Sequence, residues 1–240
     1  MNPFALAGLG ALAAAGAGVT AWAAVHPRAQ LFGPALNRVR PGAIALTFDD
    51  GPNPAITPDL LRLLETHSAP ATFFLIGKHV RACQELTREI ADRGHVVANH
   101  TETHPNLFWL SAARVRDELA RAHDAIAEAT GRAPMWMRPP YGMRGPNLDG
   151  VVRGLGYRGV VLWSRIAWDW KALPNPRMAA EFRAVRGGDL LCMHDGAPEA
   201  LGADRRHTVA ALADWLPRWR DAGLRFVTVD DAVAPASSRP

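Results

Sequence analysis

Short apolar runs alternate with amphipathic stretches along most of this chain. The apolar runs are bounded by turn-forming residues and have the length of buried strands. They predict strands at residues 43–48, 71–76, 95–98, 135–137, 159–163, 189–193 and 225–229. Apolar residues at helical spacing fill the intervals and predict helices from residue 57 and at 80–93, 111–130, 148–155, 176–186 and 208–222. A strand followed by a helix, repeated this often, is typical of an α/β protein with a parallel sheet covered by helices.

Local signals mark the ends of two of these helices. Thr57 precedes a proline at the first helical position, so its hydroxyl is expected to cap the first helix. The helix at 111–130 carries apolar residues on one face, and Gly131 is expected to end it. The chain has no internal repeat, so the order of elements leaves two α/β folds to consider, an open doubly wound sheet and a barrel.

The polar residues best suited to chemistry follow the predicted strands. They are Asp49 and Asp50 after the first strand, His100 after the third, Arg138 after the fourth, Asp169 beyond the fifth and His194 after the sixth. In barrels of alternating strands and helices, the active site is built from loops at the carboxyl ends of several strands. This regularity favours a (β/α) barrel over an open sheet and predicts that the site lies at that end of the barrel.

The composition is that of a globular protein with a full core. Of the 240 residues, 48% are hydrophobic and 21% are charged, which argues against disorder. The net charge of +4 comes from scattered arginines, since Lys78 and Lys171 are the only lysines, and it indicates a solvated basic surface and no nucleic-acid partner. Cys83 and Cys192 are too few and too far apart to indicate a disulfide framework or a cysteine zinc site.

The first part of the chain has a different character. Residues 4–25 carry no charge and, as a helix, are long enough to span a bilayer core of about 30 Å. The segment is rich in alanine and glycine and ends in small residues that also suit signal-peptide cleavage, so it is a membrane anchor or a signal peptide, with the anchor favoured. We therefore divide the chain into a hydrophobic segment at 1–25, a linker at 26–41 and a catalytic domain at 42–235.

The sidedness of such an anchor is ambiguous. Arg28, Arg38 and Arg40 follow the segment, and by the positive-inside tendency they would keep the domain cytoplasmic. An extracytoplasmic substrate would require the opposite orientation. A membrane-anchored, a secreted or periplasmic, and a cytoplasmic-facing protein therefore all remain as alternatives.

Two histidines and a carboxylate form a candidate metal site. His100 and His104 are four residues apart, which brings both imidazoles to one side of a helical turn or tight loop. Together with Asp50 they make a recurrent ligand set for zinc or another divalent metal with open positions for water and substrate. Glu102, which lies between the histidines, is expected to point away and to be solvated.

Two further pairs provide candidates for proton transfer. Asp49 would take a proton from the attacking water, with Arg138 holding it ionised, although an aspartate before Gly51 is also good turn chemistry. His194 would donate a proton to a leaving amine, with Asp169 orienting the ring and raising its pKa. The alternative for His194 is a buried structural role.

Aromatic residues near these positions could form the wall of a sugar-binding pocket, because their rings stack on sugar faces. About half of them are expected to belong to the ordinary core. The candidates are Phe108, Trp109, Tyr141, Trp168 and Trp170.

The motifs, taken in this order, resemble those of the nodulation-factor-type polysaccharide deacetylases, carbohydrate esterase family 4. Five separated signatures carry the resemblance: Thr47 to Gly51, His100 to His104, Arg138 to Tyr141, Asp169 with Trp170, and His194. The resemblance implies a distorted barrel of seven or eight mostly parallel strands and metal-dependent hydrolysis of N-acetyl groups from amino sugars.

The resemblance also implies a role for each matching residue. Asp50, His100 and His104 would hold one divalent metal ion, zinc first, with cobalt, nickel, manganese and iron as alternatives. Asp49 would be the base and His194 the acid, steadied by Arg138 and Asp169. The backbone N–H of Tyr141 would help to hold the oxyanion, and Pro140, Tyr141 and Trp170 would contact the substrate.

Two positions depart from the family pattern. Ile166 stands where the family's fourth signature usually opens with an aspartate, and Cys192 replaces the leucine two residues before the acid histidine. Neither change removes a proton-transfer group. Both alter the pocket wall, so they bear on the substrate more than on the reaction.

The leading hypothesis is a monomeric deacetylase acting on N-acetylglucosamine units of a cell-wall or surface glycan. The hydrophobic N-terminus favours an alternative, removal of an acyl or formyl group from a lipid-linked sugar or small amide. A non-catalytic glycan-binding domain would be expected to lack a proton-transfer residue, and none is missing. A non-haem iron oxygenase shares the ligand set but would leave Asp49 without a task.

Overall fold

The computed structural model describes residues 16–171 and 174–233 and contains one parallel sheet. Its strands follow the order β1-β6-β5-β4-β3-β2-β8-β7, and β9 also pairs with β2. The strands are β1 (Ala35–Leu36), β2 (Ala43–Asp49), β3 (Thr72–Leu75), β4 (Val96–Asn99), β5 (Trp136–Met137), β6 (Gly159–Val161), β7 (Arg165–Ile166), β8 (Leu190–His194) and β9 (Arg225–Val227). All of these strand pairs are parallel.

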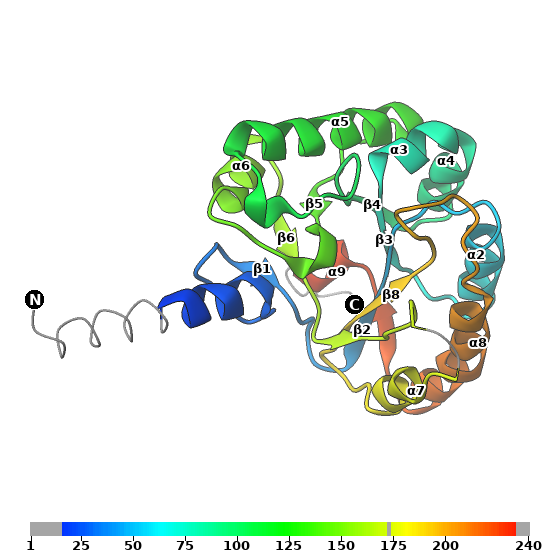
Figure 1. The fold of residues 1–240 in the computed structure, drawn as a ribbon. Coiled ribbons are helices and arrows are strands. Elements are labelled where there is room, and N and C mark those ends of the chain that lie inside the picture. Colours follow the sequence, from blue (N-terminus) through cyan, green and yellow to red (C-terminus); the bar gives the residue numbers. More distant parts are fainter. Residues whose placement is uncertain (1–15, 172–173, 234–240) are drawn as a thin grey trace, which may run out of the picture.

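Helices surround the sheet on its outside (Figure 1). They are α2 (Thr57–Thr66), α3 (Gly77–Ala82), α4 (Gln84–Asp92), α5 (Ala112–Thr130), α6 (Leu148–Gly154), α7 (Pro176–Arg183), α8 (Arg206–Asp221) and α9 (Val229–Val233), with 3-10 turns η1 (Leu107–Trp109) and η2 (Pro140–Gly142). The main core lies between the sheet and these helices, where α2 contributes Leu60, Leu61 and Leu64 and α8 contributes Leu212 and Leu216.

The eight strands of the continuous path form a half-barrel, which confirms the predicted distorted (β/α) barrel. Strand β2 lies inside the sheet between β3 and β8, and all seven of its residues are buried, as expected for a strand covered on both faces. The two ends of the path are the short strands β1 and β7. An antiparallel bridge between Arg38 and Asp189 ties the chain after β1 to the start of β8.

Several element boundaries differ from the sequence prediction. The helix predicted at 80–93 is two helices, α3 and α4, which meet at Cys83. The strand predicted at 225–229 ends at Val227 and is followed by the helix α9. Residues 26–41, expected as a linker, include the edge strand β1, which is too short to show a periodic pattern.

The predicted helix caps had different outcomes. Gly131 ends α5 with a left-handed φ of 70°, as predicted. At the other end of α5, Ser111 provides a cap that was not predicted, because it accepts a hydrogen bond from the Arg114 backbone N–H. Thr57 does not cap α2: it is the first helical residue, and its buried hydroxyl donates a hydrogen bond to Asp195. A tertiary contact across 138 residues of sequence therefore outcompetes the local cap.

Residues 16–25 form a helix beside the catalytic domain (Figure 1), and Arg144 contacts the end of this helix. The Arg144 side chain is fully buried, and among the described residues its guanidinium forms no ion pair with a carboxylate. It donates hydrogen bonds instead to the carbonyl groups of Ala23, His26, Ala29 and Gly33, while its backbone N–H donates to Ala24. Arg144 thereby joins the end of this helix to the domain.

The predicted membrane segment at 4–25 lies partly outside the described residues. Within residues 16–171 and 174–233, no helix combines the length and the apolar character that a bilayer span requires. In the described part of the predicted segment, the exposed large apolar side chains are Val19, Trp22 and Val25.

Candidate active site

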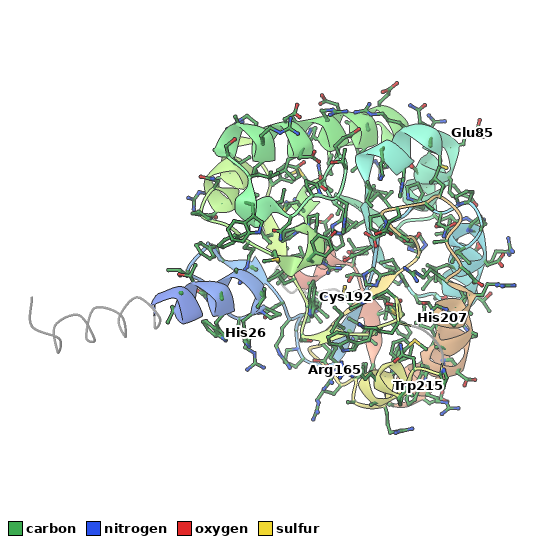
Figure 2. All side chains as sticks on the ribbon, viewed as in Figure 1. His26, Glu85, Arg165, Cys192, His207 and Trp215 are labelled. Atoms are coloured by element: carbon green, nitrogen blue, oxygen red, sulfur yellow. The ribbon has the colours of Figure 1, made fainter. Side chains whose placement is uncertain are left out.

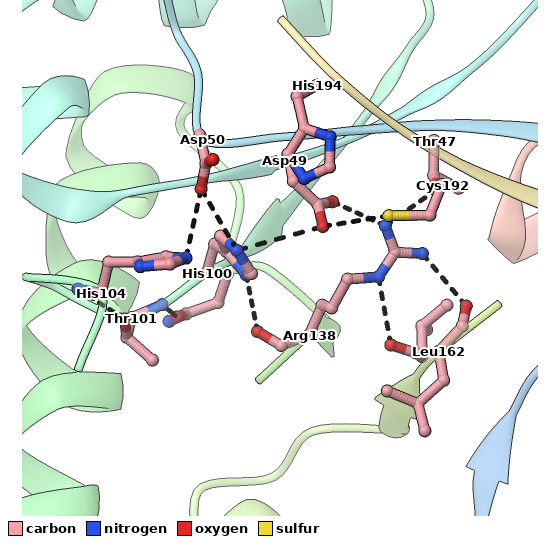
Figure 3. Close-up of polar contacts among 12 residues, drawn as sticks. Thr47, Asp49, Asp50, His100, Thr101, His104, Arg138, Leu162, Cys192 and His194 are labelled. Atoms are coloured by element: carbon pink, nitrogen blue, oxygen red, sulfur yellow. Dashed lines mark hydrogen bonds and ion pairs between the residues drawn. The ribbon is translucent and has the colours of Figure 1, made fainter. Parts of the chain in front are cut away.

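The candidate residues meet at the carboxyl ends of the strands. Asp49 ends β2 and is paired in register with His194, the last residue of β8. Asp50 follows directly, while His100 follows β4 and Arg138 follows β5. The prediction that these residues share one end of the sheet is confirmed, and Figure 3 shows them facing one another.

Asp50, His100 and His104 have the geometry of a metal-binding triad. The Oδ1 atom of Asp50 lies 3.5 Å from Nε2 of His100 and 3.3 Å from Nε2 of His104. One donor atom from each residue lies within 4.8 Å of the other two. Asp50 Oδ1 is buried and has no hydrogen-bond partner in the described part of the chain. An orphaned carboxylate oxygen facing two imidazole nitrogens fits a divalent cation held by one oxygen and two nitrogens.

The protonation states of the triad residues suit the binding of a divalent cation. Burial, assisted by the neighbouring His100, lowers the pKa of His104 to about 4, so this imidazole is neutral near pH 7. Burial alone would raise the pKa of Asp50, but the close contact with His100 and the electrostatic effect of the neighbouring histidines bring it well below its usual range. Nδ1 of His100 lies 2.7 Å from the Arg138 carbonyl oxygen, so Nδ1 carries the proton and Nε2 is free to bind a metal.

The loop from His100 to His104 is held by a set of buried polar side chains. Asn99 accepts a hydrogen bond from the Thr101 backbone N–H, and Thr101 in turn accepts one from the His104 N–H. Glu118 on α5 accepts hydrogen bonds from both the backbone N–H and the hydroxyl of Thr103. These contacts fix the spacing of the two histidines from outside the triad.

The expectation that Glu102 is solvated is wrong. Its side chain is only 3% exposed and lies 3.3 Å from Arg81 of α3 and 3.4 Å from Arg121 of α5. The backbone N–H of Lys78 also donates to the Glu102 carbonyl oxygen. Glu102 therefore joins the histidine loop, which is not helical, to two helices, and it is buried because arginines from both helices converge on it.

Left-handed backbone conformations are concentrated at the site. Of the six non-glycine residues with positive φ in the described chain, all but Ser68 lie in or beside the candidate site. These five are Asp50 (71°), Thr101 (69°), His104 (63°), Tyr141 (60°) and Trp168 (58°). Such conformations cost on the order of 1 kcal/mol or more each and persist where the surroundings impose them. The fold therefore tolerates this loss of stability and orients these side chains toward the site.

Asp49 and Arg138 form a fully buried ion pair. The Arg138 guanidinium is inaccessible to solvent and donates to Asp49 Oδ1 at 2.6 Å and to the Thr47 hydroxyl at 2.9 Å. Its remaining N–H groups donate to the carbonyl groups of Val161 and Leu162. These hydrogen bonds fix the position of the guanidinium. The guanidinium in turn holds the Asp49 carboxylate close to a positive charge and orients it toward the triad.

His194 and Asp169 form a second coupled pair. Nδ1 of His194 lies 2.7 Å from Asp169 Oδ1, while the His194 backbone N–H and the Thr208 hydroxyl donate to Oδ2. Burial alone would lower the pKa of His194, but the charge and hydrogen bond of Asp169 raise it to about 9. His194 is therefore protonated near pH 7, with Nε2 as the remaining donor.

The predicted aromatic residues divide into two groups. Tyr141 is 61% exposed and packs edge-on against His104, and Trp170 is 37% exposed and packs against His194, so both rings border the site. Pro140 is buried in the same turn as Tyr141. Phe108 instead packs against Phe32 of the N-terminal region, as an ordinary structural contact.

Comparison with known proteins supports the family resemblance that the sequence motifs indicate. A family model described as polysaccharide deacetylase matches residues 37–160. A chitooligosaccharide deacetylase from a Bradyrhizobium species is 39% identical over 77% of this chain and 87% of the relative. A peptidoglycan-N-acetylglucosamine deacetylase from Bacillus cereus is 35% identical over 78% of this chain and 86% of the relative.

The chain belongs to the polysaccharide deacetylase family. A crystal structure of a peptidoglycan N-acetylglucosamine deacetylase superposes with a TM-score of 0.77 at 28% identity, covering 85% of this chain and 95% of that one. The predicted membership of carbohydrate esterase family 4 is thereby confirmed, and so is the predicted class of enzyme, a hydrolase of carbon–nitrogen bonds other than peptide bonds.

The two departures from the pattern of the polysaccharide deacetylases lie side by side. Ile166 is a half-buried residue of β7 and pairs in register with Cys192 of β8. Cys192 is fully buried, and its thiol donates a hydrogen bond to Asp49 Oδ2 at 3.4 Å. The cysteine therefore contacts the candidate base and does not merely line the pocket wall.

A buried acid beneath the site escaped the sequence analysis. Asp195 is inaccessible to solvent, and burial, with the nearby charge of Asp50 as a further contribution, raises its pKa to about 7. Its Oδ2 accepts the Thr57 hydroxyl, and a Cβ atom at Gly51 would overlap its carboxylate. Asp195 thus supports the turn that carries Asp50. Its place directly after His194 is the only sequence signal for it.

Proposed function

We propose that this polysaccharide deacetylase removes acetyl groups from N-acetylglucosamine residues of a cell-surface glycan. One observation carries the proposal: an orphaned carboxylate oxygen faces two imidazole nitrogens, between an arginine-paired aspartate and an aspartate-paired histidine. Hydrolysis of an amide needs a base for water, an acid for the departing amine and a positive centre for the oxyanion. The site has a candidate for each of these tasks.

Asp50, His100 and His104 would hold the divalent cation. When bound there, the cation would polarise the amide carbonyl and lower the pKa of a water molecule toward ~7. Zinc suits a site of one carboxylate and two imidazoles with open positions, so we propose zinc as the resident ion.

The proton transfers fall to the two buried pairs. Asp49, which is paired with the Arg138 guanidinium, takes a proton from the attacking water. His194, kept protonated by Asp169, gives its Nε2 proton to the amine nitrogen as the carbon–nitrogen bond breaks. The backbone N–H of Tyr141, a residue with a left-handed conformation, would donate to the developing oxyanion.

Substrate contacts and location follow from the surroundings of the site and from the relatives. The exposed rings of Tyr141 and Trp170 border the site on two sides, where they can stack on sugar faces. The relatives named above act on chitooligosaccharides and on peptidoglycan. We therefore propose an N-acetylated glycan outside the cytoplasm as the substrate, with Pro140 shaping the turn that presents Tyr141.

The direct test is acetate release from chitin oligomers and peptidoglycan fragments by the purified full chain. We expect a chelator to abolish turnover and zinc to restore it. Turnover that survives complete removal of metal would rule out the proposed chemistry. Release from one glycan and not the other would identify the substrate class.

Substitution of the base separates catalysis from metal binding. Asp49→Asn is expected to retain the metal, as measured by elemental analysis, and to lower kcat by roughly 10² or more, because the base is lost while the ligands remain. Asp214→Asn is a matched control, since that side chain is 74% exposed on α8. Equal kcat values in the two variants would contradict the role given to Asp49.

A further inference from the structure

A second group of metal-ligating side chains lies beside the first. It consists of Asp49, Cys192 and His194, each of which offers one donor atom within 4.8 Å of the other two. Thiolate, imidazole and carboxylate are the three donor types that zinc prefers in proteins. Figure 3 shows the Cys192 sulfur directed at the Asp49 carboxylate, and Figure 2 shows that this residue lies in the interior.

The backbone holds these three side chains in place. Cys192 and His194 are two residues apart on β8, so their side chains project from the same face of the strand. Asp49 on the adjacent strand β2 is paired in register with His194. The convergence therefore depends on two adjacent strands inside the sheet and needs no loop movement.

Each residue has one donor atom that its structural partners leave available. Arg138 occupies Oδ1 of Asp49, and Oδ2 faces the Cys192 sulfur at 3.4 Å. Asp169 occupies Nδ1 of His194, which leaves Nε2. A histidine whose other ring nitrogen is bonded to a carboxylate is the usual form of a zinc-binding histidine.

We propose that this group binds a second thiophilic divalent ion, such as zinc or cadmium, beside the catalytic site and that this ion inhibits the enzyme. Binding replaces the thiol proton of Cys192 and the Nε2 proton of His194, both of which go to solvent, and forms bonds to sulfur, nitrogen and Asp49 Oδ2. Zinc holds such atoms at about 2.0–2.3 Å, so small side-chain rotations bring the three to a common ion.

The inhibitory part of this inference rests on the proposed function, because Asp49 and His194 are the proposed base and acid. An ion that engages both would prevent each proton transfer. The binding part does not depend on catalysis and can be measured without a substrate. A protein that bound two ions but showed no deacetylation would contradict the proposed function and leave the second site intact.

The metal-free full chain, titrated with zinc by calorimetry and with cobalt by absorption, tests the second site. We expect two equivalents, the second with the near-ultraviolet charge-transfer band of a cobalt–thiolate bond. Cys192→Leu and Cys192→Ser are each expected to bind one equivalent without that band. Retention of the first equivalent shows that the variants are folded.

The matched control is Cys83→Ser, since Cys83 is the other cysteine and lies at the junction of α3 and α4. This variant is expected to keep both equivalents. Activity is compared, for each protein, with that of the same protein loaded with one metal equivalent. On this scale, excess zinc or cadmium should inhibit the wild type and Cys83→Ser. It should not inhibit the Cys192 variants. Binding of one equivalent by the wild type, or of two by Cys192→Leu, would overturn the proposal.

Discussion

The pairing of His194 with Asp169 makes a quantitative prediction about the pH dependence of the reaction. The carboxylate raises the pKa of the imidazole from 6.5 to about 9, which corresponds to about 3 kcal/mol in favour of the imidazolium. Asp169→Asn keeps the size of the side chain and removes its charge. Without the charge, burial lowers the pKa of His194, so the proton needed by the leaving amine is lost at a lower pH.

We expect the alkaline limb of the kcat/KM profile to move down by about two pH units in Asp169→Asn. The rate ratio between wild type and variant should be small near pH 6 and should grow toward ~10² above the wild-type limb. A bound cation lowers the pKa of His194 in both proteins, so the displacement between the two profiles is the predicted quantity. Histidine NMR of the metal-free proteins measures the same shift directly.

Thr208→Val serves as the control for this experiment. It removes another hydrogen bond to Asp169 without changing the charge of the pair, so it should leave the alkaline limb within a few tenths of a unit of its original position. If Asp169→Asn lowered the rate equally at every pH, Asp169 would only position His194. The assignment of His194 as the acid would then lose its main support.

Three further predictions concern Arg138, Glu102 and Asp195. Arg138→Leu leaves the buried Asp49 carboxylate without its partner and should lower the free energy of unfolding by about 3–5 kcal/mol, as measured by urea titration. A loss under about 1 kcal/mol would contradict a buried ion pair. Glu102→Gln should weaken metal binding by about 10–100-fold by calorimetry, because the histidine loop loses its charged ties; unchanged affinity would make Glu102 purely structural. In the metal-free protein the raised pKa of Asp195 means that the folded state keeps a proton that the unfolded state loses above about pH 4, so stability falls as pH rises from 4 to about 7. Asp195→Asn should reduce that fall, and an unaltered slope would show that another group causes it.

The parts of the site that the sequence predicted are those with a local signal. Asp49, Asp50 and His194 sit at the ends of apolar runs, and the carboxyl ends of parallel strands meet at one edge of the sheet whatever lies between them. The order of strands and helices was predictable for the same reason, since each long element carries its own periodicity. Strands of two residues, such as β1 and β7, have no periodicity to detect.

The residues that surround the site could not be found in this way. Glu102 is buried because α3 and α5 bring Arg81 and Arg121 to it, and neither helix can be placed against the loop from sequence spacing. Thr57 has every local feature of a helix cap, yet its hydroxyl meets Asp195. Such assignments depend on which distant groups become neighbours, and local propensity does not contain that information.

The environment of Arg144 has a consequence for proteolytic processing of this chain. The carbonyl groups that surround its guanidinium lie on both sides of a cut after Ala24, with Ala23 before it and His26, Ala29 and Gly33 after it, and the small residues Ala21, Ala23 and Ala24 are where a signal peptidase would be expected to cut. Cleavage after Ala24 would withdraw the Ala23 carbonyl from a guanidinium that water cannot reach and the Ala24 carbonyl from the Arg144 backbone N–H, at about 1.5–3 kcal/mol for the charged hydrogen bond alone. Trimming therefore carries an energetic penalty inside the folded domain, and the intact polypeptide is the more stable form.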